Sequence, residues 1–399
     1  MKKTIEEIEK NQCTGCGLCA EKCPKGCILM IEDREGFRFP QIDSSKCIQC
    51  GICFSKCPTT SIAESLYSKY NRKYYCGIIK NKEILIDSSS GGIFGALAEY
   101  IINIGGYVCG CVYTDDLEAV HKLSNDKQDV KKMYGSKYVQ SRAEHCFPEI
   151  QNLLSENEKV LFTGTACQIA ALRLFLGKDY SNLYCVEILC HGVPAPGLFR
   201  EYKRFLEKKL RGKIKDIRFR DKHRDGWGSE HRMCIIYERK GKIYQKRPIL
   251  PAYFSAFFYG LNLRESCYQC KFATIERVAD LTIGDFWGSW SKYKKRFHEG
   301  ISVVGINTEK GEILSNSISD KFAFSDTLHE KEAIISNDNF THPIKRPMER
   351  TFFYESVKRK GYKGLWKNTY ITKSYRKKTL ASLYGAFIPE KIRMLRHRK

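Results

Sequence analysis

CTGCGLCAEKCP at residues 13–24 and CIQCGICFSKCP at residues 47–58 are the two stretches that decide how this chain begins to fold. Each has three cysteines at every third position, followed by a fourth cysteine directly before a proline. Because the two stretches share this spacing, they form an internal repeat. Between them, apolar runs at residues 28–32 and 37–40 flank Asp33-Arg34-Glu35-Gly36, which predicts a β-hairpin with glycine at its turn.

The cysteine spacing is typical of iron-sulfur ligands. A Cys-x-x-Cys-x-x-Cys loop supplies three of the four thiolates that a cubane cluster needs, and in two-cluster ferredoxins the cysteine before proline ligates the other cluster. Zinc is the competing interpretation, but two triplets that each end in Cys-Pro fit it poorly. We therefore predict a ferredoxin-type module with two [4Fe-4S] clusters, one held by Cys13, Cys16, Cys19 and Cys57 and the other by Cys47, Cys50, Cys53 and Cys23. Cys27 is needed by neither cluster and is expected to pack as a small apolar residue.

Length and composition limit the class of protein. A chain of 399 residues is long enough for two or three domains, and 42% apolar residues suffice for packed cores. The first residues, MKKTIEEIEK, lack the apolar stretch of a secretory signal. We therefore expect a cytoplasmic protein, in which the 19 cysteines stay reduced and clustered ones bind metal more often than they form disulfides. No segment is apolar over enough residues to predict a membrane span.

The net charge of +23 is unevenly distributed, since residues 341–399 carry 17 Lys or Arg against 3 Glu. Such a basic tail suits an acidic partner, anionic lipid or nucleic acid, and a solvated basic surface is the simpler alternative. No nucleic-acid-binding motif accompanies the charge, so nucleic acid is not expected as a partner.

From about residue 73 the pattern changes to strands alternating with amphipathic helices. Residues 93–104 have helical periodicity and 107–113 read as a strand, as do 160–163 and 183–189. The runs at 214–220, 232–237 and 243–246 favour an antiparallel meander instead. The predicted fold class is therefore α+β, with an N-terminal dicluster ferredoxin-like module followed by a mixed α/β core.

A second set of cysteines lies outside the repeat. Cys267 and Cys270 form a Cys-x-x-Cys pair, which leaves two ligands to be found. Cys167 and Cys190 are the best candidates, because each follows a predicted strand and the carboxyl ends of neighbouring strands converge on one crevice. We predict a third [4Fe-4S] cluster from these four, with a redox dithiol or a zinc site as the alternatives. The remaining cysteines are expected to be buried without a function: Cys76, Cys109, Cys111, Cys146, Cys185 and Cys234.

The chain has no Gly-x-Gly-x-x-Gly fingerprint and no P-loop. It does have two turns of small residues ahead of predicted helices, where free N–H groups favour an anion such as pyrophosphate. An ordinary helix N-cap is the alternative for both. The candidate cofactor-binding residues in these turns are Ser89, Ser90, Gly91, Gly92, Thr163, Gly164 and Thr165.

Seven stretches in a fixed order carry a family resemblance: residues 89–92, 135–141 (GSKYVQS), 162–168 (FTGTACQ), 190–194 (CHGVP), 267–270, 279–288 (ADLTIGDFWG) and 300–304 (GISVV). Together they resemble the coenzyme F-420 hydrogenase/dehydrogenase beta-subunit family over about residues 73–310. The resemblance suggests a ferredoxin domain at 1–70, the N-terminal family region at 71–158, the C-terminal region with the third cluster at 159–335, and a basic extension at 336–399. Many relatives have proline where this chain has Ala166, which leaves the neighbouring Cys167 unaffected.

The resemblance implies a flavoprotein that binds FAD and passes electrons between its clusters and a hydride-accepting small molecule. It adds Lys137 to the candidate cofactor-binding residues, and His191 lies near the same motifs. A surface or hydrogen-bonded structural role is the alternative for both. Family members reduce a deazaflavin or chlorophyll-type pigments, and ferredoxin-fused bacterial members often accompany polysaccharide synthesis genes. A ferredoxin or another low-potential carrier is the expected redox partner. The competing functions are an electron-transfer subunit without an activity of its own, and an iron-sulfur protein that binds nucleic acid.

Overall fold

The computed structural model describes residues 2–224, 226–227, 233–247, 252–335 and 337–368. The strands are β1 (Ile28–Glu32), β2 (Arg38–Ile42), β3 (Lys73–Ile79), β4 (Tyr107–Tyr113), β5 (Ala119–Ser124), β6 (Val160–Thr165), β7 (Leu183–Ile188), β8 (Lys213–Arg218), β9 (Cys234–Arg239), β10 (Lys242–Lys246), β11 (Leu281–Asp285), β12 (Ser302–Ile306) and β13 (Phe322–Leu328). The α-helices are α1 (Leu18–Glu21), α2 (Ile52–Ser55), α3 (Lys82–Asp87), α4 (Ile93–Asn103), α5 (Lys127–Met133), α6 (Phe147–Ser155), α7 (Ala166–Leu176), α8 (Pro196–Leu210), α9 (Ala252–Phe258), α10 (Ser289–Lys292), α11 (Glu309–Asn316), α12 (Glu330–Ile334) and α13 (Glu349–Asn368). Short 3-10 helices lie at Ile5–Glu7, Ser61–Leu66, Glu144–Cys146, Glu265–Gln269, Phe297–Glu299, Ser319–Lys321 and Asp338–Phe340.

In the N-terminal module, each cysteine repeat folds into a loop that leads into a one-turn helix. Gly17 and Gly51 precede α1 and α2 with φ of 78° and 76°, a left-handed conformation that glycine adopts without strain. β1 and β2 pair antiparallel, starting with Ile28 opposite Ile42. The hairpin predicted from the sequence is confirmed, and Gly36, at φ 84°, lies in its turn.

The main body contains an eight-stranded sheet in the order β13-β3-β12-β11-β7-β6-β4-β5. The strands β4, β6, β7 and β11 run parallel, whereas β12, β3 and β13 alternate in direction on one side and β5 runs antiparallel to β4 on the other. Parallel neighbours need a crossover connection, which α7 provides between β6 and β7. The predicted mixed α/β core is therefore confirmed.

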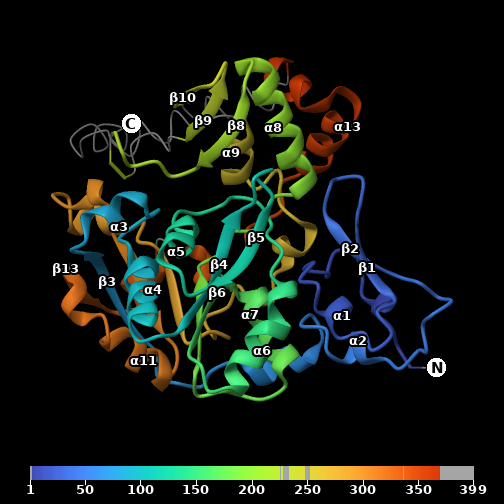
Figure 1. Cartoon of the computed structure of the whole chain (residues 1–399), viewed down its shortest axis with the longest axis horizontal. Helices are drawn as coiled ribbons and strands as arrows, with labels where there is room; N and C mark the ends of the chain where they lie inside the picture. Colours follow the sequence, from blue (N-terminus) through green and yellow to red (C-terminus); the bar gives the residue numbers. More distant parts are fainter. Residues whose placement is uncertain (1, 225, 228–232, 248–251, 336, 369–399) are drawn as a thin grey trace, which may run out of the picture.

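Helices cover both faces of this sheet (Figure 1). One face packs against α6 and α7 and buries Phe162, while the other packs against α4, α5 and α11 and buries Leu161. Successive side chains of a strand point to opposite faces, so these two neighbours enter different cores. A strand that is buried on both faces reads as a continuous apolar run, as residues 160–162 do.

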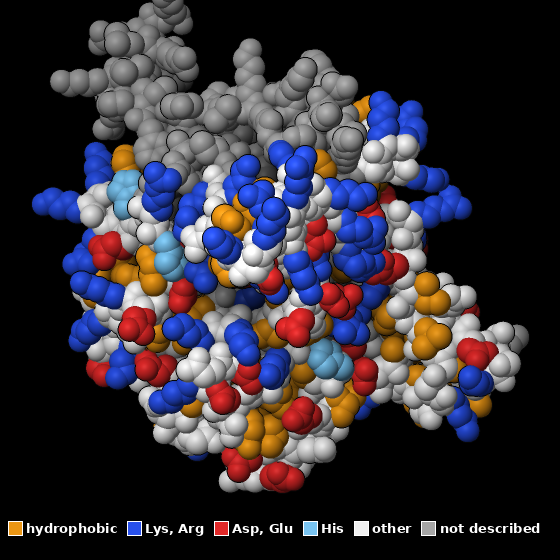
Figure 2. Space-filling model, turned by 45° about the horizontal axis from the view of Figure 1, so that its top comes forward, with side chains coloured by type: hydrophobic (Ala, Val, Ile, Leu, Met, Phe, Trp, Pro, Cys, Tyr) orange, Lys and Arg blue, Asp and Glu red, His pale blue; other side chains and the backbone are white. Residues whose placement is uncertain are grey.

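A second lobe lies above the main sheet in Figure 1 and consists of β8, β9, β10, α8, α9 and α13. Its three strands pair antiparallel in the order β10-β9-β8, which confirms the predicted meander over its described residues. The core of this lobe also takes in Phe37 from the N-terminal module, so the hairpin that carries Phe37 reaches the lobe. In Figure 2, Lys and Arg side chains crowd the upper half of the view. Lys208 of α8 and Arg211 directly after it are exposed.

The predicted division into segments 1–70, 71–158, 159–335 and 336–399 stays a prediction. β3 begins at Lys73, just after the first boundary, but the eight-stranded sheet draws strands from both of the next two segments. In the last segment α13 contacts α8, and residues 369–399, which hold nine of the 17 basic residues of the tail, lie outside the described residues. Within the described part of the chain, no helix is both long and apolar enough to cross a membrane.

Candidate functional site

The first cysteine triplet lies together with a cysteine from the second repeat. Burial raises the pKa of the Cys16 thiol well above its usual value, and the negative charges of Cys57, Cys19 and Cys13 raise it further. Cys19 and Cys57 also belong to one buried cluster of the module. The structure therefore brings Cys57 close to the first triplet, and the assignment of the four ligands to one cluster stays a prediction.

The second triplet shares a cavity with one cysteine of the first repeat and with Cys27. Cys47, Cys50, Cys53 and Cys23 all line it, and its empty volume is about 340 Å³, the open mouth included. Cys27 also lines this cavity, and its Sγ lies 3.3 Å from Cys23 Sγ. Five thiols therefore surround a space for which the sequence predicts four ligands. The repeat provides no reason to include Cys27, because this residue lies outside it.

A third cysteine cavity lies at the carboxyl ends of β6 and β7. Cys167 is the second residue of α7, Cys190 follows β7, and Cys267 and Cys270 lie in and just after the 3-10 helix Glu265–Gln269. All four line one cavity whose empty volume is about 600 Å³, the open mouth included. The structure thus brings together the four predicted ligands of the third cluster from three separate elements.

Other side chains of this cavity are polar and half-buried. Thr14 of the N-terminal module contributes to its wall, and Thr165 Oγ1 lies 3.1 Å from Cys167 Sγ. His191 also lines the cavity. Its Nδ1 lies 3.4 Å from Asn339 Oδ1, and its buried Nε2 has no hydrogen-bond partner among the described residues. Burial lowers the pKa of His191, so the imidazole is neutral at physiological pH.

Buried cations beside the cavity test whether its residues fit an iron-sulfur cluster. Arg277 lines the cavity and is only 4% exposed, and its Nη1 lies 3.3 Å from Glu187 Oε1. Arg264 is 1% exposed, and no carboxylate pairs with it in the described part of the chain. A cubane held by four thiolates is a net anion, and a buried cation needs a counter-charge. Arg277 already has Glu187 as its counter-charge, so the fit to a cluster rests on the four thiols and on Arg264.

A single metal ion is the alternative occupant of these thiols. A zinc ion needs its sulfur ligands at about 2.3 Å from one point. Among the residues that the structure describes, no three or more His, Cys, Asp or Glu side chains are grouped closely enough to hold one metal ion.

The first candidate flavin loop, residues 89–92, lies between α3 and α4 at the edge of the sheet. Its polar groups contact the chain itself: Ser90 Oγ donates to Ile301 O at 2.9 Å, and Gly91 N donates to Ser302 Oγ at 2.9 Å. A Cβ on Gly91 would lie 2.1 Å from a carbonyl oxygen of β3, so this glycine is required by backbone packing. Lys222 Nζ donates to Ser90 O at 2.7 Å, and burial lowers the pKa of Lys222 to about 7.

The second candidate turn, residues 163–165, ends β6 at the same edge of the sheet. β6 is four strand spacings from β3, which is roughly 19 Å. Lys137 belongs to a segment that docks on the first loop, since Ser136 N donates to Ser89 Oγ at 2.7 Å. Its own ammonium donates to Lys132 O and Tyr134 O at the end of α5. The structure therefore does not gather all predicted flavin contacts at one point, and a ligand would have to extend along the sheet edge to reach both turns.

Two residues near the cysteines are not predicted by the sequence. Arg264 and Arg277 are single arginines among 68 Lys and Arg, with no spacing pattern that marks them. The nearest signal is that Arg264 lies three positions before Cys267, and sequence alone offers no reason to expect a buried side chain there.

Two protein families match parts of the chain. The family described as "4Fe-4S dicluster domain" matches residues 12–61, and the one described as the C terminus of the coenzyme F420 hydrogenase/dehydrogenase beta subunit matches residues 157–327. The resemblance to the beta-subunit family noted from the sequence is confirmed over residues 157–327, and the ferredoxin-type module is confirmed over residues 12–61. The first match also supports the predicted iron-sulfur clusters of the N-terminal module.

A curated relative and a solved structure are similar to this chain. The coenzyme F420-dependent sulfite reductase of Methanocaldococcus jannaschii is 25% identical over 398 residues, which is 98% of this chain and 59% of the relative. The chain therefore spans less than two thirds of that relative's length. A chain of the F420-reducing [NiFe] hydrogenase complex from Methanosarcina barkeri aligns with a TM-score of 0.43 and 17% identity, covering 79% of this chain and 91% of that one.

Proposed function

Because this chain carries a 4Fe-4S dicluster domain at residues 12–61 and the C-terminal region of the coenzyme F420 hydrogenase/dehydrogenase beta-subunit family at residues 157–327, we propose that it is an iron-sulfur flavoprotein oxidoreductase. It passes electrons between [4Fe-4S] clusters and a hydride-accepting small molecule through FAD. The two family matches support the iron-sulfur oxidoreductase class. The third cluster, the flavin and the substrate are the proposed parts.

The observation that carries the proposal is the cavity lined by Cys167, Cys190, Cys267 and Cys270. These thiols come from positions far apart in the sequence, and a site built in this way serves a ligand more often than it serves packing. Thr14, from the loop that holds the first N-terminal cluster, lies in the wall of the same cavity. An electron that enters through the N-terminal module therefore has a short path to the main body.

The residues around the cavity have distinct proposed roles. The four thiolates hold the third cluster, and Arg277 offsets part of its negative charge while Glu187 and the backbone carbonyls of Phe272 and Asn339 fix the guanidinium. The neutral His191 offers a hydrogen-bonding nitrogen inside the cavity. Bound FAD would exchange one electron at a time with a cluster and two with a substrate.

The proposed flavin contacts are those predicted from the sequence. Residues 89–92 and 163–165 lie at one edge of the sheet, where the carboxyl ends of β3 and β6 meet the starts of α4 and α7. Ligands of open α/β sheets bind at this edge, and helix starts favour phosphate groups. Lys137 is proposed to stabilise the first of these loops through its contacts at the end of α5.

The substrate and the partner are proposed by chemical class. Coenzyme F420 is the first acceptor to test because the curated relative depends on it, and an acceptor from polysaccharide synthesis is the second. The donor is proposed to be a ferredoxin or another low-potential carrier with an acidic surface, because Lys and Arg side chains crowd one face of this protein (Figure 2). Complementary charge speeds the encounter of such partners.

Anaerobic purification with iron, sulfide and flavin quantified together tests the proposal. We expect about twelve irons and one FAD per chain, since each cubane contributes four irons. About eight irons would remove the third cluster, and bound zinc in place of iron would contradict the scheme. Loss of the absorbance of bound flavin on adding reduced F420 would show that this flavin exchanges hydride with F420.

One observation favours a second candidate function, an electron-transfer subunit without its own substrate. Ser90 and Gly91 already direct polar groups to Ile301 and Ser302, which leaves fewer groups of this loop for a phosphate. In that case the purified protein would contain its irons but flavin well below one equivalent, and it would still reduce a partner protein.

A further inference from the structure

Arg264 connects the two parts of the molecule that hold cysteine sites. Its side chain reaches the first repeat, where Nε donates to Cys13 O at 2.6 Å and Nη2 lies 3.5 Å from Cys13 Sγ. Its backbone belongs to the third cavity, because Cys267 N donates to Arg264 O at 3.0 Å and Arg264 N donates to Val193 O at 3.0 Å. One residue therefore contacts a predicted ligand of the first cluster and a predicted ligand of the third.

The charge of Arg264 is buried without a carboxylate to balance it among the described residues. The side chain is 1% exposed and lies over the rings of Phe37 and Phe39, with its guanidinium carbon 5.4 Å and 4.2 Å from their centres. Its remaining donors go to neutral acceptors, Gln140 Oε1 at 3.2 Å and Arg38 O at 2.9 Å. Guanidinium stays protonated in proteins, so this site holds a permanent positive charge. An uncompensated buried charge is costly, which points to an anion beside it.

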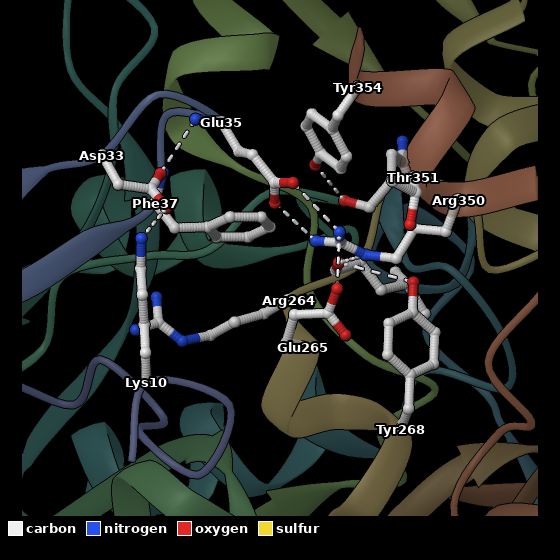
Figure 3. A network of polar contacts seen from close by, with 12 residues as sticks. Lys10, Asp33, Glu35, Phe37, Arg264, Glu265, Tyr268, Arg350, Thr351 and Tyr354 are labelled. Carbon is white, nitrogen blue, oxygen red and sulfur yellow. Dashed lines mark hydrogen bonds and ion pairs between the residues drawn. The ribbon is translucent and has the colours of Figure 1, made fainter. Parts of the chain in front are cut away.

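A neighbouring arginine shows the contrast. Arg350 is also 1% exposed, but it pairs with Glu35 and Glu265, with Nη2 2.6 Å from Glu35 Oε2 and Nη1 2.7 Å from Glu265 Oε1 (Figure 3). It holds the tip of the hairpin against the segment that carries Arg264, and no described contact joins it to a cysteine ligand. Arg350 therefore docks the module through ordinary ion pairs, whereas Arg264 lacks such a pair in the described part of the chain.

The loop of the first repeat is shaped to receive the guanidinium. Gly15 lies between Cys13 and Cys16 with φ of 66°, and a Cβ there would lie 2.7 Å from Arg264 Nη1. Gln140, which accepts from Arg264, also donates to Thr14 O at 2.8 Å, and Thr14 lines the third cavity. Arg264 can approach this closely because glycine has no side chain at position 15.

We infer that Arg264 is a positioning residue whose charge is shared by the first N-terminal cluster and the third cluster, and that it raises the reduction potentials of both. The inference rests on the proposed function, since it needs the third cluster. A cation beside a cluster favours its reduced form, and hydrogen bonds and net charge near the sulfurs set cluster potentials. With the clusters bound, Cys13 and Cys167 would each hold a one-electron carrier on either side of Arg264, and a low-potential one-electron donor would supply the electron. The guanidinium keeps its proton throughout, so no proton moves in this step.

The test uses the full chain, purified anaerobically, with Arg264→Gln, Arg264→Lys and the control Arg350→Gln. Cluster midpoint potentials are measured by electron paramagnetic resonance during titration with dithionite. For Arg264→Gln we expect the reduction equilibrium of both clusters to become tenfold less favourable. The two midpoint potentials should therefore fall by about 59 mV, the value for a one-electron couple. Arg264→Lys keeps the charge and should recover most of the shift, and Arg350→Gln should stay within about twofold of wild type in the same equilibrium.

The outcomes separate this inference from the proposed function. Wild-type protein with about eight irons would contradict the third cluster before any variant is compared. With about twelve irons in the wild type, equal potentials in Arg264→Gln and Arg350→Gln would overturn the role of Arg264. If Arg264→Gln loses its irons, the potentials of Arg264→Lys test the inference instead. Potentials near wild type would support a role of the positive charge. A shift as large as the one expected for Arg264→Gln would overturn that role.

Discussion

The N-terminal cysteine loops and the third cysteine cavity differ in how they are built. Each N-terminal loop takes three predicted ligands from seven consecutive residues and is shaped locally by left-handed glycines such as Gly17 and Gly51. The third cavity takes its cysteines from the start of α7, from the end of β7 and from the segment around a 3-10 helix. The first kind of site depends on local backbone geometry, and the second depends on the whole sheet.

This difference in construction is not a difference in burial. Cys19, Cys53 and Cys57 of the N-terminal loops are buried, whereas all four cysteines of the third cavity are half-buried. Arg277 lines the third cavity, and Arg264 contacts both regions. Because the construction differs, changes in the two regions should have different consequences, and three variants with matched controls test this, beginning with the change that should matter most.

The largest effect is expected when a ligand of the assembled cavity is removed. Cys190→Ala should lose about four of about twelve irons, because three thiolates from separate elements hold a cubane poorly, while the N-terminal clusters remain. The measurement is iron and sulfide content together with the spectrum of the reduced protein. Cys185→Ala is the control, because Cys185 lies on the preceding strand β7 but is buried in the core away from the cavity. If Cys190→Ala kept its full iron content, the prediction that Cys190 is a ligand of a third cluster would be wrong.

A smaller effect is expected where the two regions meet. Gly15→Ala puts a methyl group at 2.7 Å from the Arg264 guanidinium, in a left-handed conformation that costs about 1–2 kcal/mol by itself. Overpacking should add roughly 1–3 kcal/mol. Gly26→Ala has the same conformational cost, but no atom lies within 4 Å of its new methyl group. Urea unfolding of the anaerobic protein should therefore show a larger loss of stability for Gly15→Ala, and equal losses would argue against a tight contact between the regions.

The smallest effect is expected for Cys27→Ala in the N-terminal module. Cys27→Ala should leave the iron content unchanged, whereas Cys23→Ala should lose about four irons, because the repeat predicts Cys23 as the ligand. The structure makes the comparison necessary, since the two sulfurs lie 3.3 Å apart in the same cavity. If Cys27→Ala lost iron and Cys23→Ala kept its full iron content, Cys27 rather than Cys23 would be the cluster ligand.

Much of the fold could be predicted from periodicity and turn residues. The hairpin at Gly36, the strand at residues 107–113 and the helix at residues 93–103 are found within a residue or two of their expected limits. The order of the eight strands could not be predicted, because pairing between distant strands leaves no pattern in a single sequence. Cys27 lies close to Cys23 through a local turn, in which Gly26 N donates to Cys23 O at 3.0 Å. What the sequence does not show is that this turn lines the cavity of the second triplet.

The N-terminal ligand loops are encoded in the sequence alone, because their cysteines are so close along the chain that backbone geometry brings them together. The sequence also named Cys167, Cys190, Cys267 and Cys270 as candidates. That these four line one cavity became evident only from the three-dimensional fold, because β6 and β7 had to become parallel neighbours before their ends could meet. The position of Arg264 between the two regions likewise comes from the fold, because burial and the lack of a carboxylate partner among the described residues are properties of three-dimensional packing.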